Sequence, residues 1–134
     1  AKHGTEANGI VAMNNGGTGY QNMIVLHEAY DNNGPVGRIY VGGNGTFGQA
    51  HNAVTDFDTF YTMAFGYKTD DCASSLNGDT PNTDSSVVLP DKANITMMKI
   101  MRGYSNLAYH GRLKYLRYYP KKLSNASIQL LSTN

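Results

Sequence analysis

The sequence predicts an all-β protein, an antiparallel β-sandwich that ends in one short C-terminal helix. Fifteen glycines among 134 residues, together with many asparagines, supply the turns that such a chain needs. Short apolar runs recur about every ten residues, which is typical of sandwiches rather than of alternating β and α units. Only two glutamates occur, Glu6 and Glu28, so residues that favour surface helices are scarce.

The apolar runs define the expected strands. They are Gly9–Met13, Met23–Tyr30, Val36–Val41, Thr59–Lys68, Cys72–Leu76, Ser86–Leu89, Ile95–Met101 and Leu107–Tyr119. Clusters of Gly and Asn separate them, at residues 14–17, 31–35, 42–45, 77–79 and 102–106. Glycine and asparagine tolerate the positive φ of tight hairpin turns, and Asn77-Gly78 is the strongest such signal.

The run Thr59–Lys68 indicates how the sandwich core is built. Its side chains alternate, and one set is apolar throughout: Tyr61, Met63, Phe65 and Tyr67. Because successive side chains of a strand point to opposite faces, we expect this set to face the core.

The run Ile95–Met101 is less one-sided. Ile95, Met97 and Lys99 alternate with a second set, Thr96, Met98 and Ile100, and both sets are largely apolar. A strand with two apolar faces is expected either inside a sheet or at an oligomer contact.

The C-terminal end predicts a strand, a stop and a helix. Arg112–Tyr119 interleaves large apolar residues with Arg and Lys, the pattern of a half-buried strand. Pro120 cannot donate to a ladder, so the strand ends there. Ser124 is a suitable N-cap for a helix over about Asn125–Leu131, which must dock on the sheet because two turns are marginal alone.

The segment GRLKYLRYYPKKLSNASIQLL resembles the closing pattern of a known family, the concanavalin-like, laminin-G-like jelly-roll domains of bacteriophage virion proteins. In that pattern a strand leads to Tyr-Tyr-Pro, two basic residues, Leu-Ser and a short helix. Phe60–Asp79 is similar to the family's central hairpin. The family often has an acidic residue at the position of Ser127, so the helix cap is expected to be weaker here. The chain is also short for such a domain.

The resemblance implies one jelly-roll domain over residues 1–134. It also implies a non-enzymatic structural protein of the virion surface, a tail-fibre tip or a capsid decoration protein. Its partners would be other virion proteins, further copies of itself, with a trimer expected, and a host surface glycan. The alternative is a carbohydrate-binding module of a secreted, non-viral protein. A small hydrolase with the same fold is a third reading.

Composition limits the other function classes. The net charge is +1 and charged residues make up 16% of the chain, which is low for a nucleic-acid binder. The single cysteine, Cys72, cannot form an intramolecular disulfide and is expected to be a small buried apolar residue. No apolar run approaches the length of a membrane span. We therefore expect neither nucleic acid nor membrane as a partner.

Catalytic and metal sites are not expected. Glycoside hydrolysis needs two carboxylates across one cleft. The close acidic pairs, Asp56/Asp58 and Asp70/Asp71, fall in turn-like sequence instead. The stretch Asp31–Gly34 offers oxygen ligands for calcium, although it also reads as an ordinary turn. The histidines lack the spacing of a zinc site. They are His3, His27, His51 and His110.

A run of bases near the end carries the strongest binding signal. It comprises Lys99, Arg102, Arg112, Lys114, Arg117, Lys121 and Lys122, interleaved with Tyr104, Tyr109, Tyr115, Tyr118 and Tyr119 and without an acid. Bases with stacking aromatics can bind single-stranded nucleic acid, an anionic glycan or an acidic protein. They can equally line the outer face of the last strand and protect an edge.

A sugar site is the remaining candidate. Lectin-like loops use Asn, Asp and Gly beside a tyrosine, and Asp31, Asn32, Asn33, Tyr104 and Asn106 offer that chemistry. The same residue types dominate β-turns in general, so this pattern is weakly specific.

Overall fold

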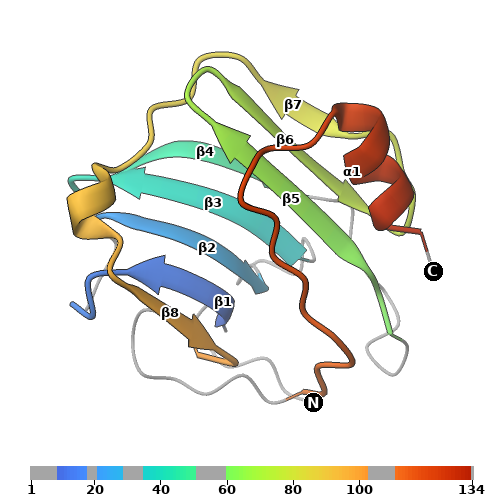
Figure 1. The fold of residues 1–134 in the computed structure, drawn as a ribbon, viewed down its shortest axis with the longest axis horizontal. Helices are drawn as coiled ribbons and strands as arrows, with labels where there is room; N and C mark the ends of the chain where they lie inside the picture. Colours follow the sequence, from blue (N-terminus) through green and yellow to red (C-terminus); the bar gives the residue numbers. More distant parts are fainter. Residues whose placement is uncertain (1–8, 18–20, 29–34, 51–59, 103–110, 134) are drawn as a thin grey trace.

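The computed structural model describes residues 9–17, 21–28, 35–50, 60–102 and 111–133. In these residues the chain is an antiparallel β-sandwich with one short C-terminal helix, as the sequence predicts (Figure 1). No helix in the described ranges is long and apolar enough to cross a membrane.

The larger sheet has five strands in the order β4-β3-β2-β1-β8. They are β1 (Gly9–Asn14), β2 (Met23–Glu28), β3 (Pro35–Val41), β4 (Asn44–Ala50) and β8 (Met97–Ile100). The first three strands pair in succession, and β8 returns from far along the chain to lie beside β1. This return is the Greek-key arrangement from which jelly rolls are built.

The smaller sheet has three strands in the order β5-β6-β7. They are β5 (Met63–Lys68), β6 (Asp71–Leu76) and β7 (Asn82–Asp84). A single turn of 3-10 helix, η1 (Lys92–Asn94), precedes β8 and brings the chain back to the larger sheet (Figure 1).

Two of the turns predicted from glycine and asparagine are present in the structure. Gly42 and Gly43 join β3 to β4 with φ values of 56° and 88°, the positive range that a two-residue hairpin requires. Asn77 and Gly78 follow β6 with φ values of 49° and 82°. These positions set where the strands end.

The core lies between the two sheets. Ile24, Ile39, Cys72 and Val87 form its buried cluster, and Phe65 and Tyr67 of β5 pack against it, as do Met13 and Leu89. The predicted inward face of β5 is therefore confirmed for Phe65 and Tyr67. At Gly37 of β3 a Cβ atom would lie 2.9 Å from the Phe65 ring, so the sheets meet there across a bare backbone.

The larger sheet also buries its opposite face. Ala12, Met23, Val25 and Tyr40 form a second buried cluster. Their register places them on the other side of the sheet from Ile24, because Met23 and Val25 flank Ile24 along β2. Strands buried on both faces read as continuous apolar runs, which matches the sequence of β2.

The helix α1 (Asn125–Leu131) docks on the outer face of the smaller sheet (Figure 1). Its bounds agree with the sequence prediction, and Ser124 is the N-cap, with its side chain accepting from the Ser127 backbone N–H at 3.2 Å. Ile128 is buried against Gly66, where a Cβ atom would lie 2.5 Å from the Ile128 Cδ1. Glycine at this position of β5 lets the helix pack closely, because a side chain here would collide with Ile128.

The prediction of a strand over Arg112–Tyr119 is wrong. Residues 111–123 have no regular secondary structure, and every residue from Gly111 to Pro120 is exposed. We call residues 111–123 the crossing segment, because they run beside β5 and then cross over the smaller sheet to reach α1 (Figure 1). Alternating side chains suit an extended chain of any kind, but a strand also needs a ladder partner, which this segment lacks among the described residues.

Three other strand predictions need correction. Ser86–Leu89 is not a strand, and β4 and β7, which lack long apolar runs, were missed. The strand within Ile95–Met101 is β8, which pairs with β1 alone among the described strands and so lies at the edge of that sheet rather than inside it. The alternative reading of that run, an oligomer contact, stays a prediction.

Candidate binding groove beside strand β5

A groove of about 210 Å³ separates β5 from the crossing segment. Strand β5 contributes one wall, and the crossing segment contributes the other. The lining residues are Leu26, the stretches 62–67 and 115–123, Ile128 and Leu131. The groove therefore follows β5 from Met63 to Tyr67, next to the edge that faces away from β6.

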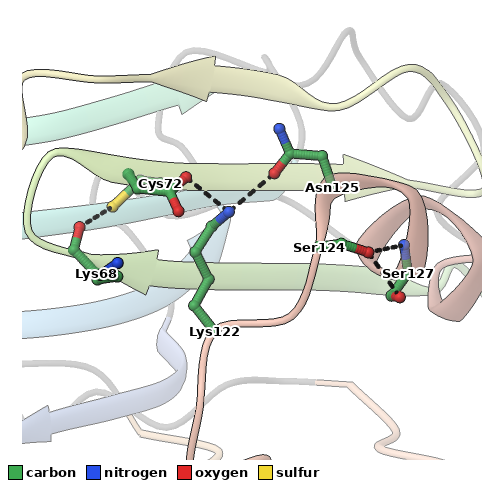
Figure 2. Close-up of polar contacts among 7 residues, drawn as sticks. Lys68, Cys72, Lys122, Ser124, Asn125 and Ser127 are labelled. Carbon is green, nitrogen blue, oxygen red and sulfur yellow. Dashed lines mark hydrogen bonds and ion pairs between the residues drawn. The ribbon is translucent and has the colours of Figure 1, made fainter.

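Lys122 fixes the crossing segment to the smaller sheet. Its Nζ lies 2.7 Å from a carboxylate oxygen of Asp71 and donates to the side-chain oxygen of Asn125 at 2.9 Å (Figure 2). The Lys122 side chain is only 6% exposed, whereas that of Asp71 is 48% exposed. The lysine stem passes over Gly66, since a Cβ atom there would lie 3.1 Å from the Lys122 Cγ.

Tyr67 and Tyr118 join the two walls of the groove by a hydrogen bond between their side chains. The Tyr67 hydroxyl also donates to the Met13 sulfur at 3.7 Å, which connects β5 to the larger sheet. Burial, followed by the hydrogen bond and charge of Tyr118, holds the pKa of Tyr67 well above its usual range. Tyr67 therefore stays a neutral hydrogen-bonding group.

The groove is positively charged. Arg117 lies over the Tyr115 ring, with its guanidinium carbon 5.3 Å from the ring centroid, and Lys121 is exposed at the opposite end of the same wall. No carboxylate is among the lining residues. Because Lys122 is already paired with Asp71, Arg117 and Lys121 are the cations that a ligand would meet.

The bases that the sequence groups together are divided by the structure. Lys99 lies on β8, while Arg112, Lys114, Arg117 and Lys121 are exposed along the crossing segment. Lys122 is the exception, a nearly buried ion-pair partner. The reading of these bases as the outer face of a last strand is wrong, because the crossing segment is not a strand.

The predicted sugar site cannot be placed. Asp31, Asn32, Asn33, Tyr104 and Asn106 all lie outside the described residues. The same holds for the calcium candidate, residues 31–34, and for Asp56, Asp58, His3, His51, His110 and Tyr109. Within the described ranges no three His, Cys, Asp or Glu side chains come together in a way that could hold a metal ion.

The acidic pair Asp70/Asp71 lies at the turn between β5 and β6. Asp70 occupies the β5–β6 turn with a φ of 56°, and Asp71 pairs with Lys122. His27 is buried on β2.

The groove was not predicted from the sequence, although two signals pointed toward it: the Tyr-rich basic run, and a glycine at position 66 in an otherwise apolar strand.

Cys72 is fully buried, and its thiol donates to the Lys68 carbonyl at 3.6 Å (Figure 2). Burial raises the pKa of the Cys72 thiol above its ordinary value of 9.0, chiefly by desolvation. The expected role as a small buried apolar residue is confirmed.

We expect Cys72 to resist labelling by a thiol reagent in the folded protein and to react fully in urea. The single cysteine makes the readout unambiguous. Because the thiolate forms more readily in the unfolded chain, the stability that this thiol contributes is present below pH 9.0 and lost as the pH rises above it. Rapid labelling of the folded protein at neutral pH would contradict the burial.

The comparisons with known proteins support the fold class and give no information on function. No protein-family model matches the chain, and a search of curated proteins finds no match. Among solved structures, the chain is similar to an S-layer domain-containing protein from Clostridium thermocellum, with a TM-score of 0.51 and 16% identity over 99% of this chain. The chain spans 66% of that solved structure, just under two thirds. The likeness supports an all-β sandwich.

Proposed function

We propose that this chain is a non-enzymatic structural domain of a virion surface, part of a tail fibre or a capsid decoration, that attaches to neighbouring proteins. The proposal begins from the resemblance of residues 111–131 and 60–79 to phage jelly-roll domains. It extends to assembly with further copies of the chain and to contact with a host glycan.

The observation that carries the proposal is the exposed apolar surface of the crossing segment. Five large side chains lie on it, each at least 39% exposed. They are Leu113, Tyr115, Leu116, Tyr118 and Tyr119. Contiguous exposed apolar patches on a folded domain mark interaction surfaces, and tyrosine is enriched there. A surface protein that works by attachment needs such a patch.

Self-association is assigned to the edge strand β8. Met97, Met98 and Ile100 are 47%, 41% and 51% exposed, and in the described residues β8 pairs with β1 alone. An apolar edge strand is a template for contact with another chain. In a closed trimer the contact is heterologous, so β8 of one copy would meet a different surface of the next copy. We therefore place the contact of the expected trimer at β8.

The groove chemistry supports a non-enzymatic role. Hydrolysis of a glycosidic bond requires two carboxylates that flank the bond. No carboxylate lines the groove, and the described acidic pair is occupied by a turn and by an ion pair. Attachment to another protein requires an accessible surface and no catalytic group.

Assembly can be tested by the light-scattering mass of the purified chain. We expect a stable trimer, and we expect a Met98→Lys/Ile100→Lys variant to be monomeric, because the lysines would bring unpaired charge into the apolar contact. Leu130→Lys adds charge at another exposed apolar site, 71% exposed on α1, and should leave the trimer intact. A monomeric parent chain would contradict self-association.

A carbohydrate-binding module of a secreted protein is the second candidate. The tyrosine-lined groove favours it, since tyrosine offers both an apolar face and a hydroxyl to a sugar. A glycan array on the same sample separates the two functions. A monomer with selective glycan binding would support the module, and a trimer without glycan binding would support the structural role.

A further inference from the structure

Side-chain contacts bridge the groove at both ends of the stretch 62–67. At one end, the hydroxyl oxygens of Thr62 and Tyr115 lie 3.5 Å apart across the two walls. At the other end, the side chains of Tyr67 and Tyr118 share a hydrogen bond. The space between these contacts is therefore short, and it suits a compact ligand rather than a chain that runs through it.

The room in the groove lies beside a small side chain. Because side chains alternate along a strand, Ala64 shares a face of β5 with Gly66. Ile128 and the stem of Lys122 pack closely on Gly66. Ala64 also lines the groove and carries only a methyl group. A longer side chain at position 64 would therefore take up space that a ligand needs.

The volume of the groove fits one six-membered ring. The groove holds about 210 Å³, whereas an apolar cavity of about 150 Å³ is enough for one benzene molecule. Drug-sized ligands fill pockets of about 300 Å³ or more. A single substituted ring is thus of the right size, with some of its substituents left in solvent.

The walls offer both kinds of contact that a sugar ring uses. Tyr115 and Tyr119 line the groove and are 49% and 42% exposed, so each can present an aromatic face to C–H groups and a hydroxyl to a sugar oxygen. Leu116 and Met63 add apolar surface. A ring that is apolar on its faces and polar at its rim matches this lining.

Charge selects among sugars. Arg117 and Lys121 line the groove, and neither forms an ion pair with a carboxylate among the described residues, whereas Lys122 is already paired with Asp71. A guanidinium group matches a carboxylate with two parallel charge-assisted hydrogen bonds. An acidic sugar can therefore use both cations, and a neutral sugar cannot.

We propose that the groove beside β5 binds one acidic sugar residue, a six-membered ring that carries a carboxylate, within a host surface glycan. This inference rests on the proposed attachment function and names the sugar chemistry of its glycan contact. A glutamate side chain of a protein partner would satisfy the cations equally well. It has no ring to fill the space beside Ala64, so the sugar is the better match.

The first experiment titrates methyl glucuronide into the isotope-labelled 134-residue chain and follows the NMR spectrum. We expect saturable binding with a Kd of about 1 mM or below, and shifted signals at Ala64 and Arg117. Methyl glucoside has the same ring without the carboxylate, and it should bind about tenfold more weakly or worse, the value of a charge-assisted hydrogen bond. Acetate supplies the carboxylate without the ring and should not compete at equal concentration.

A substitution that leaves the charge unchanged tests the space. Ala64→Leu would fill the groove, and we expect it to abolish glucuronide binding. Ala93→Leu makes the same change at an exposed site on η1, which does not line the groove, and should leave the binding unchanged. Urea unfolding midpoints close to that of the parent chain would show that both variants are folded.

The charged wall has its own matched pair. Arg117→Gln removes a cation of the groove, and Arg112→Gln removes an exposed cation of the crossing segment that does not line it. We expect Arg117→Gln to weaken methyl glucuronide about tenfold or more and to leave the binding of methyl glucoside unchanged. Arg112→Gln should change neither affinity.

Several outcomes would overturn the proposal. They are no saturable binding at about 10 mM methyl glucuronide, equal affinity for methyl glucoside, unchanged affinity in Ala64→Leu, or equal losses in Arg117→Gln and Arg112→Gln. Competition by acetate at equal concentration would also overturn it, because the ring would then contribute nothing.

Sugar binding and self-association fail separately. Glucuronide binding is expected to persist in the Met98→Lys/Ile100→Lys variant, since β8 does not line the groove. A stable trimer that binds no acidic sugar would overturn the sugar site and leave the proposed attachment to virion proteins standing. A monomeric parent chain that binds methyl glucuronide would support the sugar site and contradict self-association.

Discussion

Replacing Ile128 by alanine is expected to lower the free energy of unfolding by about 2–5 kcal/mol, the range for deleting a buried aliphatic side chain. Ile128 is 3% exposed and is the buried apolar anchor of α1 on the smaller sheet. The surroundings cannot collapse to fill the space, because its contact on β5 is Gly66, which has no side chain to move. Urea unfolding measures the loss as a lower midpoint at an unchanged m-value.

The matched control for this change is Leu130→Ala. Leu130 lies in the same helix but is 71% exposed, so the same kind of truncation should change the stability by less than about 0.5 kcal/mol. Equal losses for the two variants would mean that α1 is not anchored through Ile128. Because Lys122 is linked to Asn125 at the start of α1, we also expect Ile128→Ala to loosen the adjacent wall of the groove.

Replacing Gly37 by valine is the second change with a large expected effect. A Cβ atom at Gly37 would lie 2.9 Å from Cδ2 of Phe65 and 3.0 Å from its Cγ. The ring is held between the sheets and packs against the buried core cluster, so it cannot swing away at low cost. We expect a loss of about 1–3 kcal/mol or more, the range for inserting atoms into a packed core.

Gly45→Val is the control for Gly37→Val. Gly45 is the second residue of β4, beside the β3–β4 turn, and a Cβ atom there would meet nothing closer than the Tyr40 ring at 3.7 Å. Valine suits a strand, so this change should be close to neutral. If Gly37→Val were as stable as the parent chain, the two sheets would not meet at Phe65. Thermal unfolding of both variants decides the point.

Local signals allowed much of the fold to be predicted. The helix over Asn125–Leu131, its N-cap at Ser124 and the turn at Asn77-Gly78 all depend on residues close together in the chain. Alternation along β5 identified the face that meets the core, because period two is a property of any strand. Local residues set the positions of these features, although the two-turn helix still needs the sheet to dock on.

Two strands show where local signals end. β4 carries few apolar residues and forms because β3 offers it a ladder of partners from Val36 to Val41. Arg112–Tyr119 has the better strand pattern and yet has no ladder partner among the described residues. Strand formation depends on a neighbour that may be distant in sequence. The residue pattern alone therefore predicted a strand at Arg112–Tyr119 and none at β4.

The candidate site shows the same division. The sequence indicated a basic, tyrosine-rich stretch, but it grouped Lys122 with the exposed bases. In the fold Lys122 is nearly buried beside Asp71, and the groove arises only because this stretch passes along the outer edge of β5. Neither fact follows from spacing along the chain, because each joins residues about fifty positions apart in different elements.

The sequence by itself therefore determined the all-β class, the turns, the inward face of β5 and the capped helix, since neighbouring residues set backbone preference and side-chain direction. Tertiary structure alone decided the order of the strands, which of them lie at edges, and which cation is buried. These depend on contacts between residues far apart in the chain, and the exposed edges and the groove are consequences of those contacts.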